Sequence, residues 1–79
     1  MDEQVLKAIN DAFNPQHIDS HLEVAGGRVF GSVTVVGSST FDDLDDIRRQ
    51  RLLWDQLRKI LGAQSSAVGP IVLEPTRRG

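Results

Sequence analysis

Two consecutive glycines, Gly26-Gly27, separate two runs of residues with a β-strand pattern, and this pair constrains the fold more than any other feature. Both central positions of a type I′ turn need positive φ, which glycine adopts at little cost. The sequence therefore predicts a β-hairpin over Ile18 to Val36 with a two-residue loop. A loop of fixed length also fixes which residues face each other across the two strands.

The pairing counted outward from this turn gives the hairpin two different faces. One face is nearly all apolar or small, and its cross-strand pairs are Val24–Val29, Leu22–Gly31, Ser20–Val33 and Ile18–Val35. The opposite face carries Asp19, His21 and Glu23 against Thr34, Ser32 and Phe30. The two strands thus agree on which side belongs to the core, and a slip of one residue would destroy that agreement.

The longest helical pattern of the sequence runs from Thr40 to Gly62. We predict that Thr40 caps its amino end, with Asp43 in the reciprocal position. Gly62 is expected to cap the carboxyl end, where a left-handed conformation is cheapest for glycine. The alternative boundary is a short separate turn followed by a helix that begins near Asp45.

One side of this helix is apolar. At about 100° per residue, six apolar side chains fall in one sector, namely Ile47, Leu53, Trp54, Leu57, Ile60 and Leu61. Gln50 lies in the middle of the sector and is expected to hydrogen-bond to backbone at the border between helix and sheet, because an unpaired buried amide is costly. Trp54 is expected in the core, and a partner surface is the alternative.

Two further elements complete the predicted fold. Asp2 to Phe13 has apolar residues at helical spacing and ends at Asn14-Pro15, where proline interrupts the ladder. Pro70 to Glu74 has the pattern of a short third strand. Because a strand–helix–strand crossover leaves its strands parallel, the third strand is expected beside the second. We therefore predict an α+β domain of order αββαβ, whose three-stranded mixed sheet is covered on one face by two helices and is open on the other.

Size and composition limit the class of protein. The chain has 79 residues, which predicts one domain over 1–79, with a core at about 3–74 and a tail at 75–79. It has no cysteine, so neither a disulfide nor a thiol nucleophile can come from this chain. No apolar run approaches the roughly 18 residues of a membrane span, and the acidic start is unlike a secretory signal. We expect a cytoplasmic protein that makes no contact with a membrane.

These elements in this order resemble the BolA-like family of small α/β proteins, whose fold is akin to the second type of KH domain. The resemblance extends from Val5 to Thr76. Its best-matching part is Phe41-Asp-Asp-Leu44, followed by Arg49-Gln-Arg-Leu-Leu-Trp54 and Leu57, where the family has Phe-x-Gly-x and then Arg-His-Arg. The run from Val33 to Phe41 also resembles the central strand of the family and the segment after it.

The sequence departs from the family at the positions that carry its cofactor chemistry. In the family, a histidine at the start of the third strand is a ligand for an iron–sulfur cluster shared with a monothiol glutaredoxin, and Gly69-Pro70 fills that place here. Gln50 stands where the family has a histidine in the long helix. The family also often has a longer loop between the first two strands, with a second candidate ligand, and Gly26-Gly27 takes the place of that loop here. We therefore expect this chain to bind no cofactor of its own.

His17 and His21 are the two histidines of the sequence. In a strand, His21 points to the open face between Asp19 and Glu23, where it is the candidate metal ligand. The favoured alternative is an ordinary solvated strand face. His17 is expected in a loop.

Five cations of the long helix are a candidate site for nucleic acid or another anion, and they are Arg48, Arg49, Arg51, Arg58 and Lys59. The favoured alternative is a set of solvated charges paired along the helix, for example Asp45 with Arg49. The net charge of −2 argues against broad attraction to nucleic acid. The GxxG loop that clamps the nucleic-acid backbone in KH domains is absent from Gly37-Ser-Ser-Thr40.

We expect no enzymatic activity, since nothing in the sequence places a pocket or a nucleophile beside the strand carboxylates. By resemblance, the expected function is that of a non-catalytic regulatory or adaptor protein. The resemblance links such proteins to iron–sulfur or redox handling through a monothiol glutaredoxin partner, and also to stress response and transcription regulation. One alternative is a nucleic-acid-binding module that uses the basic helix. Another is a protein-interaction domain without a cluster role, in which an exposed strand face or edge receives a partner.

Overall fold

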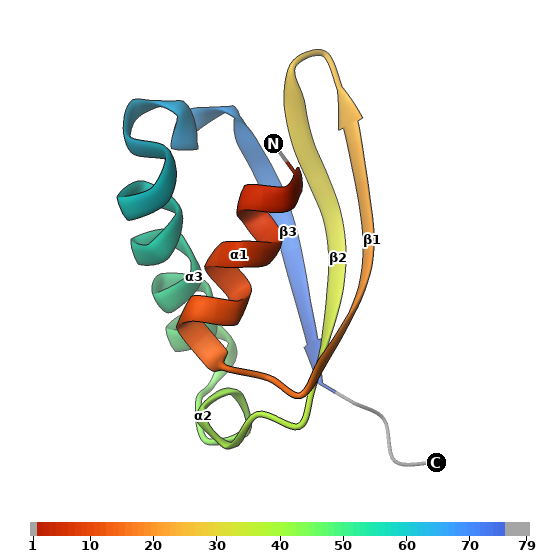
Figure 1. The fold of residues 1–79 in the computed structure, drawn as a ribbon, viewed down its shortest axis with the longest axis vertical. Coiled ribbons are helices and arrows are strands. Elements are labelled where there is room, and N and C mark those ends of the chain that lie inside the picture. The colour runs from red at the N-terminus through yellow and green to blue at the C-terminus, as the bar shows by residue number, and fades with distance from the viewer. Residues whose placement is uncertain (1, 76–79) are drawn as a thin grey trace.

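The computed structural model describes residues 2–75 of the chain. Of the tail expected at 75–79, Pro75 belongs to the last strand, and residues 76–79 lie outside the described range. The elements shown in Figure 1 are α1 (Asp2–Phe13), β1 (His17–Ala25), β2 (Arg28–Val36), α2 (Ser39–Asp42), α3 (Asp46–Leu61), a 3₁₀ helix η1 (Gly62–Ala67) and β3 (Val68–Pro75).

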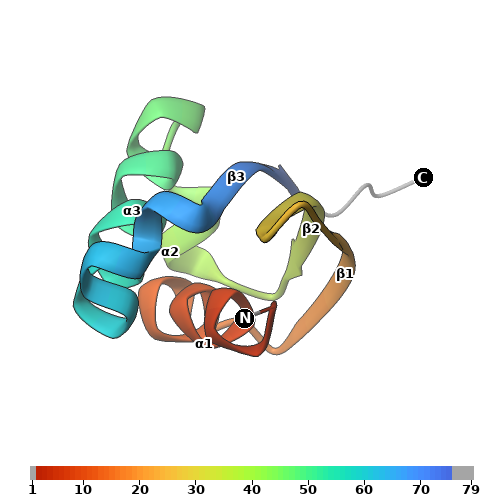
Figure 2. The same ribbon diagram turned by 90° about the horizontal axis from the view of Figure 1, so that it is seen from above.

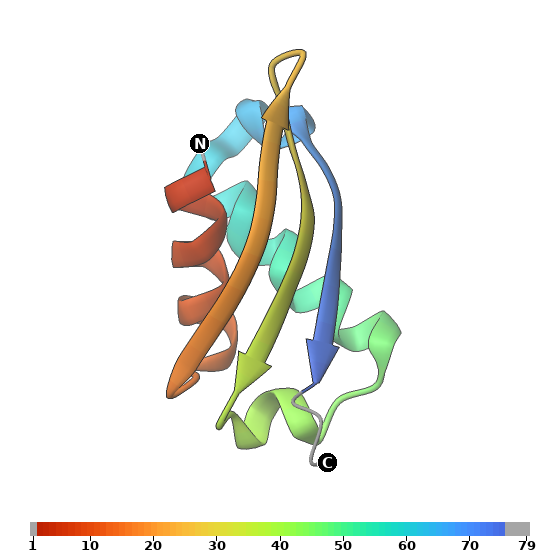
Figure 3. The same ribbon diagram turned by 90° about the vertical axis from the view of Figure 1, so that its right-hand side faces the viewer.

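The hairpin has the register that the sequence predicts. Every cross-strand pair from the turn outward to Ile18–Val35 is the predicted one. Gly26 and Gly27 both have positive φ, at 58° and 72°, as a type I′ turn requires. β3 lies beside β2 and runs parallel to it, so the sheet order is β1-β2-β3 (Figure 3). The predicted three-stranded mixed sheet is confirmed.

β3 begins two residues earlier than predicted and contains an irregularity. Val29 of β2 pairs with Val68, whereas Gly31 pairs with Ile71. Over this interval β3 therefore has one residue more than β2, which is the definition of a β-bulge. Pro70 lies in the bulge, where the missing N–H of proline costs no ladder hydrogen bond.

The stretch predicted as one helix from Thr40 is two helices, and the alternative boundary is the correct one. The N-cap of α2 is Ser38, whose Oγ accepts a hydrogen bond from the N–H of Phe41 at 3.1 Å. The N-cap of α3 is Asp45, whose Oδ1 accepts one from the N–H of Arg48 at 2.8 Å. Thr40 lies inside α2 and caps neither helix.

The composition of the break explains this correction. Four of the five residues from 42 to 46 are aspartates, whose side chains compete with the helical ladder and are favourable at caps. At the other end of α3, Gly62 is the C-cap as predicted and has a positive φ of 58°. Its ψ of −128° lies outside the left-handed helical region, so the predicted conformation is not the one adopted.

The core lies between the sheet and the helices, which occupy the same face of the sheet (Figure 2). α1 and α3 supply its helical side, β2 and β3 its strand side, and Phe41 of α2 closes one end. The fully buried apolar side chains are Val5, Ala8, Ile9, Phe13, Val29, Val33, Val35, Phe41, Leu53 and Leu57.

Two residues expected to face the core are exposed. Ile47 is 73% exposed, because it lies at the margin of the helical sector and Phe41 fills the core at that end of α3. Val24 is 61% exposed, because it stands beside the turn, which extends past the ends of both long helices in Figure 1. The pairing of Val24 with Val29 nevertheless forms as predicted.

Gly31 is the position where a side chain would disturb the hairpin most. Its φ is 143°, and a Cβ built on it would lie 2.1 Å from the carbonyl oxygen of His21. We expect Gly31→Ala to lower the free energy of unfolding by about 3 kcal/mol, because β1 would have to move. The control is Gly62→Ala, where φ is also positive but no atom lies within 4 Å of the new Cβ. Its backbone strain alone should cost about 1–2 kcal/mol, and a loss as large as that of Gly31→Ala in urea unfolding would contradict the account.

Candidate functional site

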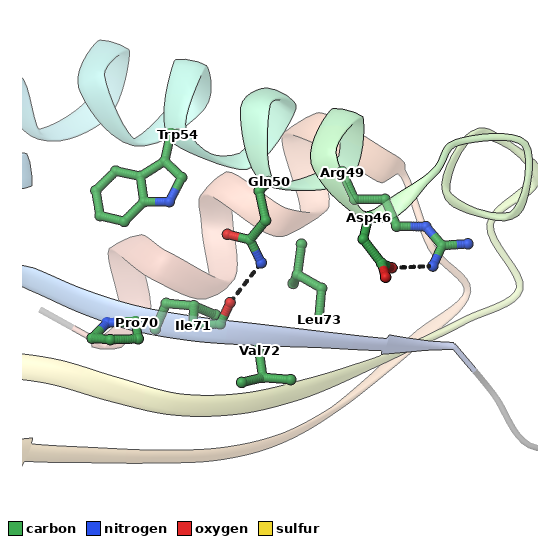
Figure 4. Close-up of a pocket in the computed structure, with 8 residues that line it drawn as sticks. All are labelled: Asp46, Arg49, Gln50, Trp54, Pro70, Ile71, Val72 and Leu73. Carbon is green, nitrogen blue, oxygen red and sulfur yellow. Dashed lines mark hydrogen bonds and ion pairs between the residues drawn. The ribbon is translucent and has the colours of Figure 1, made fainter.

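A groove of about 330 Å³ runs between α3 and the outer edge of β3 (Figure 4). Side chains three or four positions apart line its helical wall, since they share one side of a helix. The strand wall is the segment of β3 that starts in the bulge, at Pro70, and continues to Leu73. The lining residues are Asp46, Arg49, Gln50, Trp54, Pro70, Ile71, Val72 and Leu73.

Gln50 joins the two walls of the groove. Its Nε2 donates a hydrogen bond of 2.8 Å to the backbone carbonyl of Ile71, as Figure 4 shows. The prediction that Gln50 bonds to backbone at the border between helix and sheet is confirmed. The amide satisfies a carbonyl on the free edge of β3, which would otherwise lack a strand partner.

Trp54 forms the wall of the groove one helical turn beyond Gln50. It is half-buried and packs against the core, so the expectation of a core residue holds only for part of its surface. Figure 4 shows its ring above β3, near Pro70. Val72 also lines the groove and is 53% exposed, but Figure 4 shows its side chain on the side of β3 away from α3. The apolar surface at this end of the groove is therefore that of Trp54.

Arg49 is mostly buried and makes contacts within the fold. Only 12% of its side chain is exposed. Its Nε donates a hydrogen bond of 2.8 Å to the backbone carbonyl of Phe41, and its guanidinium carbon lies 4.0 Å from the centroid of the Phe41 ring. The ring in turn meets Phe13 edge-on, with centroids 5.1 Å apart. Arg49 also pairs with Asp46 at 3.4 Å, and not with Asp45 as the sequence suggested.

The remaining cations of the candidate anion site lie on the exposed side of α3. Arg48, Arg51, Arg58 and Lys59 are all exposed. Arg58 forms an ion pair of 3.0 Å with Asp55. The structure thus divides the predicted group of five into one structural arginine and four surface cations.

The two histidines lie on β1, on the face of the sheet opposite the helices. His17 is in the strand and not in a loop, and its Nε2 is 2.9 Å from Oδ1 of Asp19. This contact turns Asp19 toward His17. His21 lies near Glu23 and Glu74 in a shallow depression of that face. Within residues 2–75, no group of three histidine, cysteine or acidic side chains is placed to hold a metal ion.

The position of the family's cluster ligand is occupied by residues that cannot ligate iron. Gly69 precedes Pro70 in the bulge, and neither has a side-chain donor. A Cβ at Gly69 would lie 3.3 Å from the carbonyl oxygen of Val29, so the backbone there is closely packed. An iron–sulfur cluster held as the family resemblance implies does not fit this chain.

The buried polar side chains of the described residues all have hydrogen-bond partners. No buried side-chain nitrogen or oxygen among residues 2–75 lacks a hydrogen-bond partner. In the groove, Gln50 is bonded to the strand, and Arg49 is bonded to Phe41 and paired with Asp46. This arrangement presents a surface for binding and leaves no buried polar group unengaged.

Comparison with known proteins was made for both sequence and structure. No family model matches the sequence. The structure is similar to the crystal structure of a Bol-like protein from Babesia bovis, with a TM-score of 0.67 over 95% of this chain and 81% of the other chain. The chain has the BolA-like fold. Sequence identity to this BolA-like structure is 16%, so the likeness concerns the fold.

Within the described residues, no helix is both long enough and apolar enough to cross a lipid bilayer.

The structural role of Arg49 can be tested by comparing neighbouring arginines. Arg49→Lys keeps the charge but loses the planar group above Phe41, so we expect the free energy of unfolding to fall by about 1–2 kcal/mol. Arg48→Lys, on the exposed side of α3, should change it by less than about 0.5 kcal/mol. Urea unfolding followed by circular dichroism measures both, and a similar small change in the two variants would contradict this role.

Proposed function

We propose that the chain is a cytoplasmic, non-catalytic adaptor that binds a protein partner at the groove between α3 and β3. The observation that carries the proposal is Trp54, which stands half-buried in this groove at the helical wall. A tryptophan that is already held in place by the core loses little freedom on binding, and such residues are frequent anchors of protein interfaces. The free edge of β3 beside it adds backbone groups that a partner can pair with.

A monothiol glutaredoxin is the partner that the BolA-like resemblance suggests, and we include it in the proposal. Gly69 and Pro70 offer no ligand at the family position. The proposed adaptor therefore contacts the glutaredoxin without taking part in cluster ligation. Any link to iron–sulfur handling would come through the partner alone.

The groove supports binding better than catalysis. Its carboxylate, Asp46, and its guanidinium, Arg49, are paired with each other at 3.4 Å. Gln50 is engaged by the backbone of β3. No nucleophile lies beside a base in this set of side chains, which is why the proposal is non-catalytic.

Nucleic-acid binding by the basic helix has weaker support. Arg49 is held by Phe41, whereas the pair of Arg58 with Asp55 is exposed and contributes little. The cations left on the surface, Arg48, Arg51, Arg58 and Lys59, form a smaller set than the sequence suggested. Phosphate contacts each need an available cation, so this loss weakens the nucleic-acid interpretation.

The proposal is tested by mixing the chain with a monothiol glutaredoxin in its apo and cluster-loaded forms. We expect co-elution with both forms, and an unchanged visible spectrum of the cluster, because this chain supplies no ligand. Trp54→Ala should weaken the affinity at least tenfold, as expected for an interface anchor. Val24→Ala, which also removes an exposed apolar side chain but far along the hairpin, is the matched control and should bind normally.

Three results would count against the proposal. Absence of co-elution would remove the glutaredoxin partner. A changed cluster spectrum would show that this chain does supply a ligand. Equal binding by Trp54→Ala, with its urea unfolding showing a folded protein, would move the interface away from the groove.

A further inference from the structure

The face of the sheet opposite the helices is uncovered, and it carries a depression of about 480 Å³ across all three strands. It is the side that faces the viewer in Figure 3. Phe30, Pro70 and Val72 give the depression an apolar centre. We call this surface the open sheet face, and its residues are His17, Asp19, His21, Glu23, Arg28, Phe30, Ser32, Thr34, Pro70, Val72 and Glu74.

Carboxylates surround the apolar centre of the open sheet face. Glu23 of β1 pairs with Phe30 of β2. Glu74 of β3 and Asp19 of β1 both pair with Thr34 of β2, so they lie on either side of it. All three carboxylates are exposed, and Asp19 is already in contact with His17 at 2.9 Å. A ligand for this face therefore needs cations on either side of an apolar contact.

The exposed side of α3 has the complementary composition. We call it the α3 outer face, and its residues are Ile47, Arg48, Arg51, Asp55, Arg58 and Lys59. It has four cations against one carboxylate. It also presents Ile47, one of the large apolar side chains that the fold leaves exposed. The open sheet face has three carboxylates, Asp19, Glu23 and Glu74, against one arginine, Arg28. The chain thus carries an acidic surface on one side and a basic surface on the other.

We propose that the occupant of the open sheet face is the α3 outer face of a second copy of this chain. The contact would give the sheet a helical layer on both faces, which is the usual way to cover a sheet completely. It would also shield the exposed apolar groups Val72 and Ile47. Pro70 and Val72 of β3 border both this surface and the groove. The open sheet face nevertheless lies on the opposite side of the sheet from the helices, so the inference does not depend on the proposed adaptor role.

The spacing of the charges fits this contact. Arg48 and Arg58 are ten residues apart in one helix, which corresponds to about 15 Å. Glu23 and Glu74 are separated by two strand spacings and by four residues along the strands. This separation is about 16 Å. Two ion pairs can therefore form at the same time.

The size of the surface predicts a weak association. Three strands of about nine residues offer on the order of 400 Å² to each partner, and stable interfaces need about 600 Å² or more on each side. Because two different surfaces meet, the contact is heterologous and adds copies one after another instead of closing a dimer. Ion pairs at its rim make it sensitive to salt.

The test uses sedimentation equilibrium of the full chain with charge-reversed variants. We expect the wild-type protein to associate between about 0.05 and 1 mM at low salt, and to be monomeric in high salt. Arg48→Glu/Arg58→Glu and Glu23→Lys/Glu74→Lys should each weaken self-association at least tenfold. An equimolar mixture of the two variants should regain self-association. The α3 outer face of one variant, with its new glutamates, can then bind the open sheet face of the other, with its new lysines.

A control is needed because the two variants also differ in net charge. Glu3→Lys/Asp11→Lys makes the same change in net charge on α1, and mixed with Arg48→Glu/Arg58→Glu it should not associate. The inference is overturned if the wild-type chain stays monomeric at 1 mM in low salt, or if the mixture does not regain association while urea unfolding shows both variants folded. It is also overturned if the control mixture associates equally, or if association is lost in a chain ending at Pro75, which would identify residues 76–79 as the cationic segment.

Discussion

The pairing of β1 with β2 in a single register is the constraint on which the rest of the structure depends. The two-residue turn sets this register, and the register decides which side chains point toward the helices. Val33 and Val35 thereby reach the core, while Phe30 and Ser32 turn to the other side. The groove between α3 and β3 and the open sheet face both depend on this register, because each is defined by the face of the sheet on which its side chains lie.

The end of the core near α2 depends on a second set of contacts. Ser38, which is buried, donates a hydrogen bond to the carbonyl of Phe13 and accepts one from the N–H of Phe41. Arg49 then lies over the ring of Phe41 and bonds to its carbonyl. These contacts tie the end of α1 to the starts of α2 and α3. They also explain why one arginine of an apparently basic helix is not available to an anion.

Local patterns predicted the parts of the fold that depend on local chemistry. The hairpin register, the limits of α1 and the bond from Gln50 to backbone follow from turn geometry, a proline stop and the cost of an unpaired amide. Ile47 and Arg49 were misplaced because their surroundings depend on α2. A sector drawn for one continuous helix cannot show that Phe41 folds back to fill the core.

The groove was only half predictable for a similar reason. Gln50 and Trp54 stand out in the sequence as a polar residue and an aromatic residue within an apolar sector. The strand wall does not, because its position depends on the extra residue near Pro70, which no alternation pattern reveals. The acidic surface on the opposite face needed both the register and the parallel alignment of β3 before Glu23 and Glu74 could be placed together.

The most direct test of this account is the nuclear Overhauser effect between Hα protons across the hairpin. Ser20 faces Val33, and Ile18 faces Val35. Counted from a two-residue turn, both are non-hydrogen-bonded pairs, in which opposite Hα atoms lie close together. The account predicts strong Hα–Hα signals for these two pairs. Strong signals from Ser20 to Ser32 or to Thr34 instead would mean a shifted register, and would contradict the assignment of both faces of the sheet.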